Sequence, residues 1–228
     1  MKKYSKFSYF LKVFFGKTNK KYEQIDNFEK TVILIREVLI ILILFLLIIR
    51  PLIFSSYYVP TGSMEPTIMT GSLLFGTPLL YGGYMPIINY KVPGFKKINR
   101  GDIVIFKYPL DPKRILVKRV IGLEGDKIEI IEKTVFVNDK PLIEPYVRYI
   151  QDPFYEDHPE IKRPNFGPVI VPKDHVFVMG DNRDNSADSR VWGFLPKKNV
   201  FSTPLIIYFS IDPITKKIRW KEIFKIIK

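Results

Sequence analysis

An unbroken run of twelve apolar residues, 38–49, is the feature that most limits what this chain can fold into. Arg50 and Pro51 follow the run, and further apolar residues flank it at 32–35 and 52–54. A membrane-spanning helix needs about 20 apolar residues, whereas a surface helix of a soluble protein has a polar face. Because this run has no polar face, the sequence predicts a transmembrane anchor over residues 31–54. A buried helix in a soluble core is the alternative.

The charges on the two sides of the run predict its orientation. Residues 1–30 contain eight lysines and three acidic residues, a net charge of +5. After Arg50, no lysine or arginine occurs before Lys91. Because positive charge is retained on the cytoplasmic side, the basic tail 1–30 is predicted to be cytoplasmic and residues 55–228 to lie outside. The tail itself fits either an amphipathic helix on the membrane or a partly ordered segment.

Residues 55–228 have the pattern of a β-rich domain. Short runs separated by Gly, Pro, Asn and Asp alternate in polarity or stay apolar for four or five residues, as strands do. These runs lie at 103–106, 117–121, 127–131, 135–137, 169–171, 175–179 and 204–210. Residues 139–168 show little strand character, and we expect an inserted lobe over about 127–170.

The C-terminal residues 213–228 are basic and amphipathic. Trp220, Ile223, Phe224 and Ile227 have the i, i+3, i+4, i+7 spacing of one helix face. Such a helix could bind anionic lipid or pack on the domain, and the sequence favours neither.

Composition excludes several kinds of chemistry. The chain has no Cys and two His, which excludes disulfides, iron–sulfur clusters and Cys-ligated zinc, and we expect no metal and no cofactor. The net charge of +13 indicates an anionic partner, either a nucleic acid or a membrane surface. Residues 55–228 carry 26 basic and 19 acidic residues but no nucleic-acid-binding motif. We therefore expect membrane lipid, and not nucleic acid, as a partner.

Three polar segments could carry chemistry. Ser63 lies in a proline-bounded turn, VPTGSMEPTI at 59–68, shortly after the predicted anchor. Lys118 lies among apolar residues in a predicted strand, where burial would lower its pKa and leave a neutral amine able to act as a general base. Residues 179–193 form a dense polar loop. The plainer interpretations are an inert surface serine, an edge-strand lysine in water, and a solvated turn.

Four sequence blocks together resemble bacterial type I signal peptidases. They are PTGSMEPT at 60–67, RGDIVIF at 100–106, KRVIGLEGD at 118–126 and GDNRDNSADSR at 180–190. Their order behind a membrane anchor is that of the family, and the resemblance covers roughly residues 51–211. It implies a mainly β Ser/Lys peptidase domain with a small inserted lobe, preceded by one N-terminal transmembrane helix in the bacterial cytoplasmic membrane.

The resemblance also implies an activity. The chain would be a membrane-anchored serine endopeptidase that removes signal peptides from exported preproteins, after small residues at −1 and −3, through an acyl-enzyme. Its partners would be the signal peptides, membrane lipid and the export machinery. Two residues depart from the family pattern. Leu116 stands where Tyr is frequent, which could reshape the pocket, and Glu124 replaces the usual Pro of a turn.

Individual roles follow from the same resemblance. Ser63 would be the nucleophile and Lys118 the general base. Thr61 would lend its hydroxyl to the oxyanion hole, and Ser186 would orient the lysine amine. Support for the site would come from a pair between Arg119 and Asp181, and from Asp188 and Arg190. The pockets for small substrate residues map to Tyr57, Val59, Pro60, Met64, Ile68, Ile105, Leu116 and Val117.

Three other functions fit parts of the sequence. Another Ser/Lys hydrolase is one, although self-cleaving repressors carry a DNA-binding domain that this sequence does not show. A membrane-anchored binding protein with an inactivated peptidase fold is the second, and it would not need Ser63, Lys118 and Ser186 intact. The third is a basic nucleic-acid binder, whose affinity would fall steeply with salt.

Overall fold

The computed structural model describes residues 13–15, 26–84, 90–149 and 165–227. The chain forms two compact units, Met1–Arg50 and Pro51–Lys228. Most of the basic tail lies outside the described residues, so the amphipathic or partly ordered state expected for it stays a prediction.

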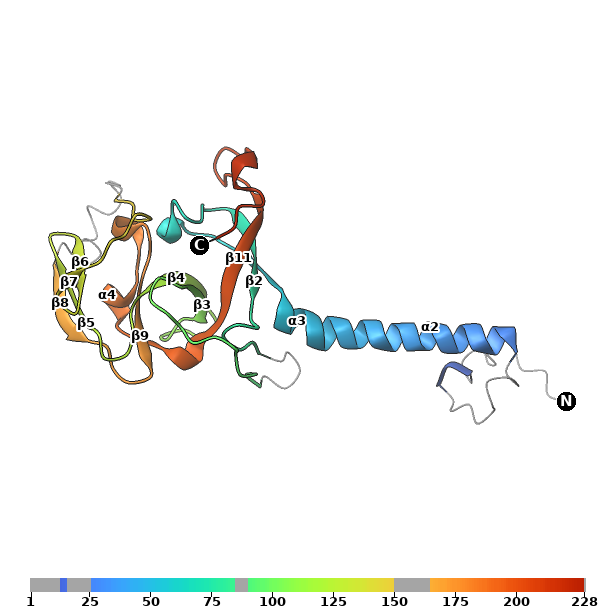
Figure 1. The fold of residues 1–228 in the computed structure, drawn as a ribbon. Helices are drawn as coiled ribbons and strands as arrows, with labels where there is room; N and C mark the ends of the chain where they lie inside the picture. The colour runs from blue at the N-terminus through green and yellow to red at the C-terminus, as the bar shows by residue number, and fades with distance from the viewer. Residues whose placement is uncertain (1–12, 16–25, 85–89, 150–164, 228) are drawn as a thin grey trace. The chain divides into compact units, whose positions relative to one another are not determined.

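A long helix is the main element of the first unit (Figure 1). Helix α2 (Asn27–Leu44) begins after Asp26, whose carboxylate accepts a hydrogen bond of 2.7 Å from the Glu29 backbone N–H. This is an N-cap, which satisfies a donor that the first helical turn leaves unpaired. A π-helical turn, η2 (Phe45–Ile49), and the short α3 (Arg50–Ile53) continue the helical backbone.

The apolar side chains in the middle of this helical segment are exposed. Each residue from Val38 to Leu47 is between 40% and 66% accessible. Among the described residues, however, no helix is long and apolar enough to cross a membrane. The anchor expected over 31–54 is therefore not confirmed and stays a prediction.

The main sheet of the second unit has seven strands within the described chain, all paired antiparallel, in the order β1-β2-β11-β3-β4-β9-β10. Four of the predicted runs, 103–106, 117–121, 175–179 and 204–210, form strands of this sheet. The strands are β1 (Ser55–Tyr58), β2 (Ser72–Thr77), β3 (Ile103–Lys107), β4 (Ile115–Gly122), β9 (His175–Met179), β10 (Leu195–Pro196) and β11 (Val200–Ser210).

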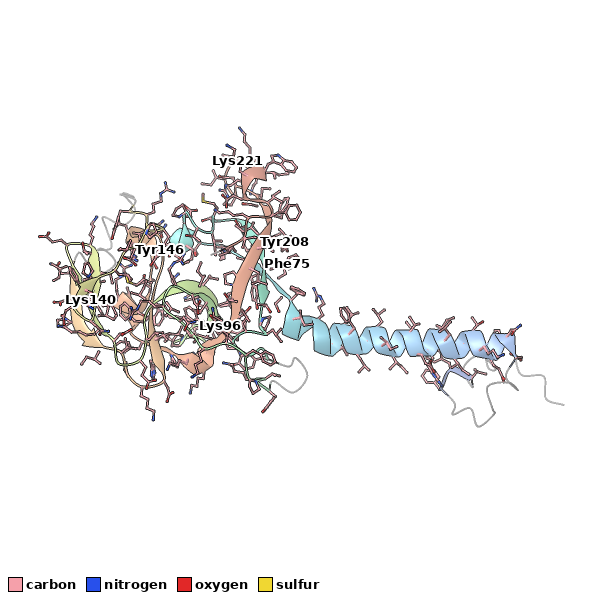
Figure 2. The ribbon with its side chains drawn as sticks, in the orientation of Figure 1. Phe75, Lys96, Lys140, Tyr146, Tyr208 and Lys221 are labelled. Atoms are coloured by element: carbon pink, nitrogen blue, oxygen red, sulfur yellow. The ribbon has the colours of Figure 1, made fainter. Side chains whose placement is uncertain are left out.

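Strand β11 connects two parts of this sheet. It pairs first with β3, through Val200 and Ser202, and then with β2 from Thr203 onward. Register shifts interrupt both pairings, and such irregularities bend a strand. Phe75 on β2 and Tyr208 on β11 stack across the second pairing, with ring centroids 4.2 Å apart (Figure 2).

A second sheet of four strands, in the order β7-β6-β5-β8, lies within the range 127–170 in which we expect an inserted lobe. Its side chains Ile128 and Val135 pack in one core with Phe177 and Met179 of β9. This core therefore joins the second sheet to the main one. The strands are β5 (Lys127–Ile131), β6 (Thr134–Val137), β7 (Lys140–Pro141) and β8 (Phe166–Ile170).

The mainly β prediction is confirmed, and each of the seven predicted strand runs overlaps an observed strand. The sequence did not indicate β1, β2, β7 and β10. β1 is the sequence SSYY at the sheet edge, with alternate residues exposed, and β7 and β10 are two residues long. Strands as short as β7 and β10 or as polar as β1 have no distinctive hydrophobic pattern. The missed strand β2, SLLFGT, is neither, and it contains three consecutive apolar residues.

The C-terminal segment is not the amphipathic helix that its spacing predicts. It lies along β11, where the Phe224 N–H donates to the Ile207 carbonyl at 2.7 Å and the Ile227 N–H to the Leu205 carbonyl at 2.9 Å. This part of β11 extends beyond its pairing with β3, so its edge needs another partner. Phe224 also has a φ of 63°, outside the helical region. The segment thus completes the sheet edge.

Candidate active site

The backbone at Ser63 is fixed from two directions. Ser63 lies in a 3-10 turn, η3 (Gly62–Met64), and the Met64 side chain is buried in the hydrophobic core. From the other side, Asn182 donates two hydrogen bonds of 3.1 Å, from its backbone N–H to the Ser63 carbonyl and from its side-chain amide to the Gly62 carbonyl. The core and the polar loop together hold the serine in place.

Strand β4 places Lys118 directly against Ser63. The lysine is 3% exposed, and its Nζ donates a hydrogen bond of 2.5 Å to the Ser63 Oγ. Burial lowers the pKa of Lys118 to about 8, although the nearby carboxylate of Asp188 acts in the opposite direction. A lysine with this pKa is partly neutral near physiological pH. It can therefore accept a proton from the hydroxyl that it contacts.

The loop after β9 packs closely on this pair. A Cβ atom at Gly180 would collide with the Ser63 carbonyl oxygen and the Ser186 side chain, so this close approach requires glycine. Asp188 accepts a hydrogen bond of 3.0 Å from the Gly180 N–H and pairs with Arg190 at 2.8 Å. Burial alone would raise the pKa of Asp188, but the Arg190 guanidinium holds this pKa below its usual value.

The predicted pair between Arg119 and Asp181 is present, and it connects all four sequence blocks. Its two hydrogen bonds measure 2.9 Å and 2.8 Å, and both side chains are buried. Arg119 also donates to the Gly101 carbonyl at 2.9 Å, and the Thr67 hydroxyl donates to Asp181 at 2.5 Å. The ring of Tyr146, labelled in Figure 2, lies 3.8 Å from the Arg119 guanidinium. This network holds the blocks in fixed positions around Ser63.

Ser186 lies beside the Ser63–Lys118 pair but does not bond to it. Its side chain is buried and lines the same cavity as both residues. Within the described part of the chain, no hydrogen bond joins the Ser186 hydroxyl to the Lys118 amine, and this hydroxyl instead helps to lower the pKa of Asp188. The expected hydrogen bond between Ser186 and the lysine amine is therefore not formed in this structure, where the amine donates to Ser63.

Two cavities meet at Ser63 and Lys118. The larger, of about 480 Å³, extends toward β1 and is mainly apolar. The smaller, of about 230 Å³, extends toward the loop at 185–187 and Trp192. Both are lined by the same five residues: Thr61, Ser63, Arg114, Leu116 and Lys118. An extended peptide with its scissile bond at Ser63 could occupy both cavities.

Six of the eight expected substrate-binding residues line the larger cavity: Tyr57, Val59, Pro60, Met64, Leu116 and Val117. The other two do not. Ile68 and Ile105 have no exposed surface and belong to the hydrophobic core. Ile105, on β3, packs in one core cluster with Val59 and Met64. The structure therefore does not place Ile68 and Ile105 on the cavity wall, and their role in substrate binding stays a prediction.

Sequence reasoning missed Arg114, which lines both cavities. A signal for it existed, because Arg114, Leu116 and Lys118 are two residues apart. Alternate residues of an extended chain face the same way. Asn182 was also missed, since its contacts with the Ser63 turn depend on tertiary structure.

The site holds few candidate metal ligands. Among residues 13–15, 26–84, 90–149 and 165–227, no group of three or more His, Asp or Glu side chains is placed to hold a metal ion. The side-chain groups at the two cavities that could take part in a reaction are thus the hydroxyls, the Lys118 amine and the Arg114 guanidinium.

The sequence is similar to those of known signal peptidases. The family model described as "Signal peptidase, peptidase S26" matches residues 32–209. Signal peptidase I of Rickettsia typhi is 33% identical over 76% of this chain and 77% of its own length. Signal peptidase I of Rickettsia prowazekii is 34% identical, with the same two coverages of 76% and 77%. Signal peptidase I of Pseudomonas fluorescens is 31% identical over 72% of this chain and 68% of its own length.

Proposed function

The chain belongs to the signal peptidases of peptidase family S26, serine peptidases that remove signal peptides, and we propose that it does so through a dyad of Ser63 and Lys118. The observation that carries this proposal is the contact of 2.5 Å between the Lys118 Nζ and the Ser63 Oγ. The lowered pKa of Lys118 supports it, because only the neutral amine can accept a proton.

The reaction follows from this contact. The Lys118 amine takes the Ser63 proton as the Ser63 Oγ forms a bond to the scissile carbonyl carbon. The tetrahedral intermediate then expels the amine of the mature protein, which receives its proton from the Lys118 ammonium. An acyl-enzyme remains on Ser63. Water, deprotonated by the neutral lysine, attacks the ester, and the signal peptide leaves as a carboxylic acid while Ser63 regains a proton.

We assign the oxyanion hole to the Thr61 hydroxyl and the Ser63 backbone N–H. Thr61 supports this assignment because it precedes the Ser63 turn and lines both cavities. Losing one such donor typically costs about 3 kcal/mol in the barrier. The loop that contains Ser186, Asp188 and Arg190 packs beside Lys118 and sets its polar surroundings. The Arg119–Asp181 pair fixes the position of this loop.

The larger cavity would accept the small residues at −1 and −3 of the signal peptide. Its apolar wall, formed by Tyr57, Val59, Met64 and Leu116, suits short apolar side chains. A bound peptide would also exclude water from Lys118, and this would further favour the neutral amine.

We further propose that residues 31–54 anchor the enzyme in the bacterial cytoplasmic membrane, with the N-terminus in the cytoplasm and the catalytic domain outside. The exposed apolar side chains from Val38 to Leu47 support the anchor. Membrane lipid also suits the C-terminal segment, where Trp220 and Phe224 are each 73% exposed among several lysines. The export machinery would deliver the substrate.

Cleavage of a preprotein with an Ala-x-Ala site by the detergent-solubilised full chain tests this function. We expect one product that begins at the residue after the second alanine, identified by mass spectrometry. Folded Ser63→Ala should give no product. Cleavage elsewhere, or equal cleavage by Ser63→Ala, would overturn the proposal.

A further inference from the structure

Arg114 occupies a position at the site that the proposed mechanism does not use. It lies at the end of the turn between β3 and β4, is exposed, and lines both cavities. Its backbone is fixed by two hydrogen bonds, from its N–H to the Asp111 carbonyl at 3.0 Å and from the Tyr108 N–H to its own carbonyl at 2.9 Å. The position of the charge is thus set by an ordered turn.

Aromatic side chains support the Arg114 guanidinium on the side of the smaller cavity. The guanidinium lies 5.5 Å from the centre of the Tyr108 ring. Tyr108 contacts Trp192 edge-on at 5.7 Å, and the Trp192 indole N–H donates to the Ala187 carbonyl at 3.2 Å. Tyr108, Ala187 and Trp192 line only the smaller cavity, whereas Arg114 lines both. The cation is therefore part of an ordered wall.

The charged side chains that line the two cavities are all positive. Their described lining contains two cationic residues, Arg114 and Lys118, and no carboxylate. Among the ion pairs formed by the described residues, none involves Arg114. Because a guanidinium stays protonated at any usable pH, Arg114 offers a permanent positive charge with no carboxylate partner of its own.

We propose that Arg114 is a specificity-determining residue that selects substrates with an acidic side chain at the first or second position after the cleavage site. The inference rests on the proposed function. The apolar larger cavity accounts for the small residues before the scissile bond, so the smaller cavity remains for the residues after it. There a carboxylate would meet the guanidinium in hydrogen-bonding geometry that arginine suits well.

The test compares kcat/KM for two peptides that share an Ala-x-Ala site and differ in having Asp or Asn at the first two mature positions. For the wild type we expect the Asp peptide to be cut about twofold to fivefold better, as an exposed ion pair allows. Arg114→Ala should bring this ratio close to one. Arg114→Glu should invert it and favour a third peptide with Lys at these positions.

Lys113→Ala is the matched control, because it removes a neighbouring exposed cation that lines neither cavity. It should keep the wild-type ratio, and added salt should reduce that ratio. Equal cleavage of the Asp and Asn peptides by the wild type, with activity still dependent on Ser63, would overturn this inference alone. If Ser63→Ala cuts the peptides as well as the wild type, the proposed function itself fails.

Discussion

The Lys118 Nζ lies 2.5 Å from the Ser63 Oγ, although the two residues are 55 positions apart in the chain. The contact is buried at both ends, since Ser63 is 8% and Lys118 is 3% exposed. A lysine is rarely buried without a carboxylate partner. Its placement against a hydroxyl therefore supports the proposed role of Lys118 in proton transfer.

The first prediction concerns pH. The pKa of Lys118 is lowered to about 8, and only the neutral amine can act as a base. We therefore expect kcat/KM to rise with pH through about 8 and to level off above it. Steady-state cleavage between pH 6 and 10, on a peptide without ionisable side chains, measures this. A rise centred at pH 10 or above would contradict a desolvated lysine base.

The second prediction separates catalysis from stability. Burial disfavours the Lys118 ammonium, so replacing the lysine with an apolar side chain of similar length, Lys118→Met, should abolish cleavage yet raise the free energy of unfolding by about 1–3 kcal/mol at pH 7. The folded-state pKa is the lower one, so the wild type gains stability as pH rises from about 8 toward 10.5, the ordinary value. The advantage of the variant should shrink over that window. Urea unfolding at several pH values tests this, and a destabilised variant would contradict it.

The third prediction concerns Gly180. A methyl group there would overlap the Ser63 carbonyl and the Ser186 side chain, so Gly180→Ala should displace the Ser63 turn and reduce kcat by at least about tenfold. Gly125→Ala is a useful control, because Gly125 has a φ of 84° but nothing within 4 Å of the added Cβ. Gly180 has no positive φ, so a fall in kcat in Gly180→Ala but not in Gly125→Ala would be due to the collision and not to backbone strain. Unchanged kcat in folded Gly180→Ala would show that the close packing has no catalytic consequence.

The fourth prediction concerns the oxyanion hole. Thr61→Val keeps the shape of the side chain but removes its hydroxyl, and we expect kcat to fall by about a hundredfold to a thousandfold with little change in KM. Thr61→Ser retains a hydroxyl and should recover most of the activity. Kinetics on a saturable peptide distinguish the two variants. If Val and Ser behave alike, Thr61 does not donate to the oxyanion.

The sequence indicated much of this fold for a physical reason. Central strands such as β3, β5 and β9 have continuous or alternating apolar residues because one or both faces are buried. The C-terminal segment was mispredicted because its helical spacing does not reveal that β11 has an edge to be covered. Hydrophobic periodicity depends only on the segment's own residues. Whether this segment forms a helix or pairs along a strand depends on β11, its neighbour in space.

For the candidate site too, the sequence predicted some features and not others. Ser63, Lys118 and the Arg119–Asp181 pair could be expected from motif resemblance, and the structure brings them together. The contacts of Asn182 with the Ser63 turn and the full burial of Ile68 and Ile105 could not, because they depend on how separate blocks pack. The same holds for Ser186, whose hydroxyl lies in the cavity without bonding to the amine.

The most direct test of the account is kcat/KM for an Ala-x-Ala preprotein at pH 9, measured with wild type, Ser63→Ala, Lys118→Ala and Lys118→Arg. All variants should first be shown to be folded by circular dichroism. We predict that each variant loses at least about a thousandfold in kcat/KM. Arginine should fail as completely as alanine, since it cannot give up its proton. Substantial cleavage by folded Lys118→Arg or Lys118→Ala would contradict the central claim that Lys118 is the base that activates Ser63.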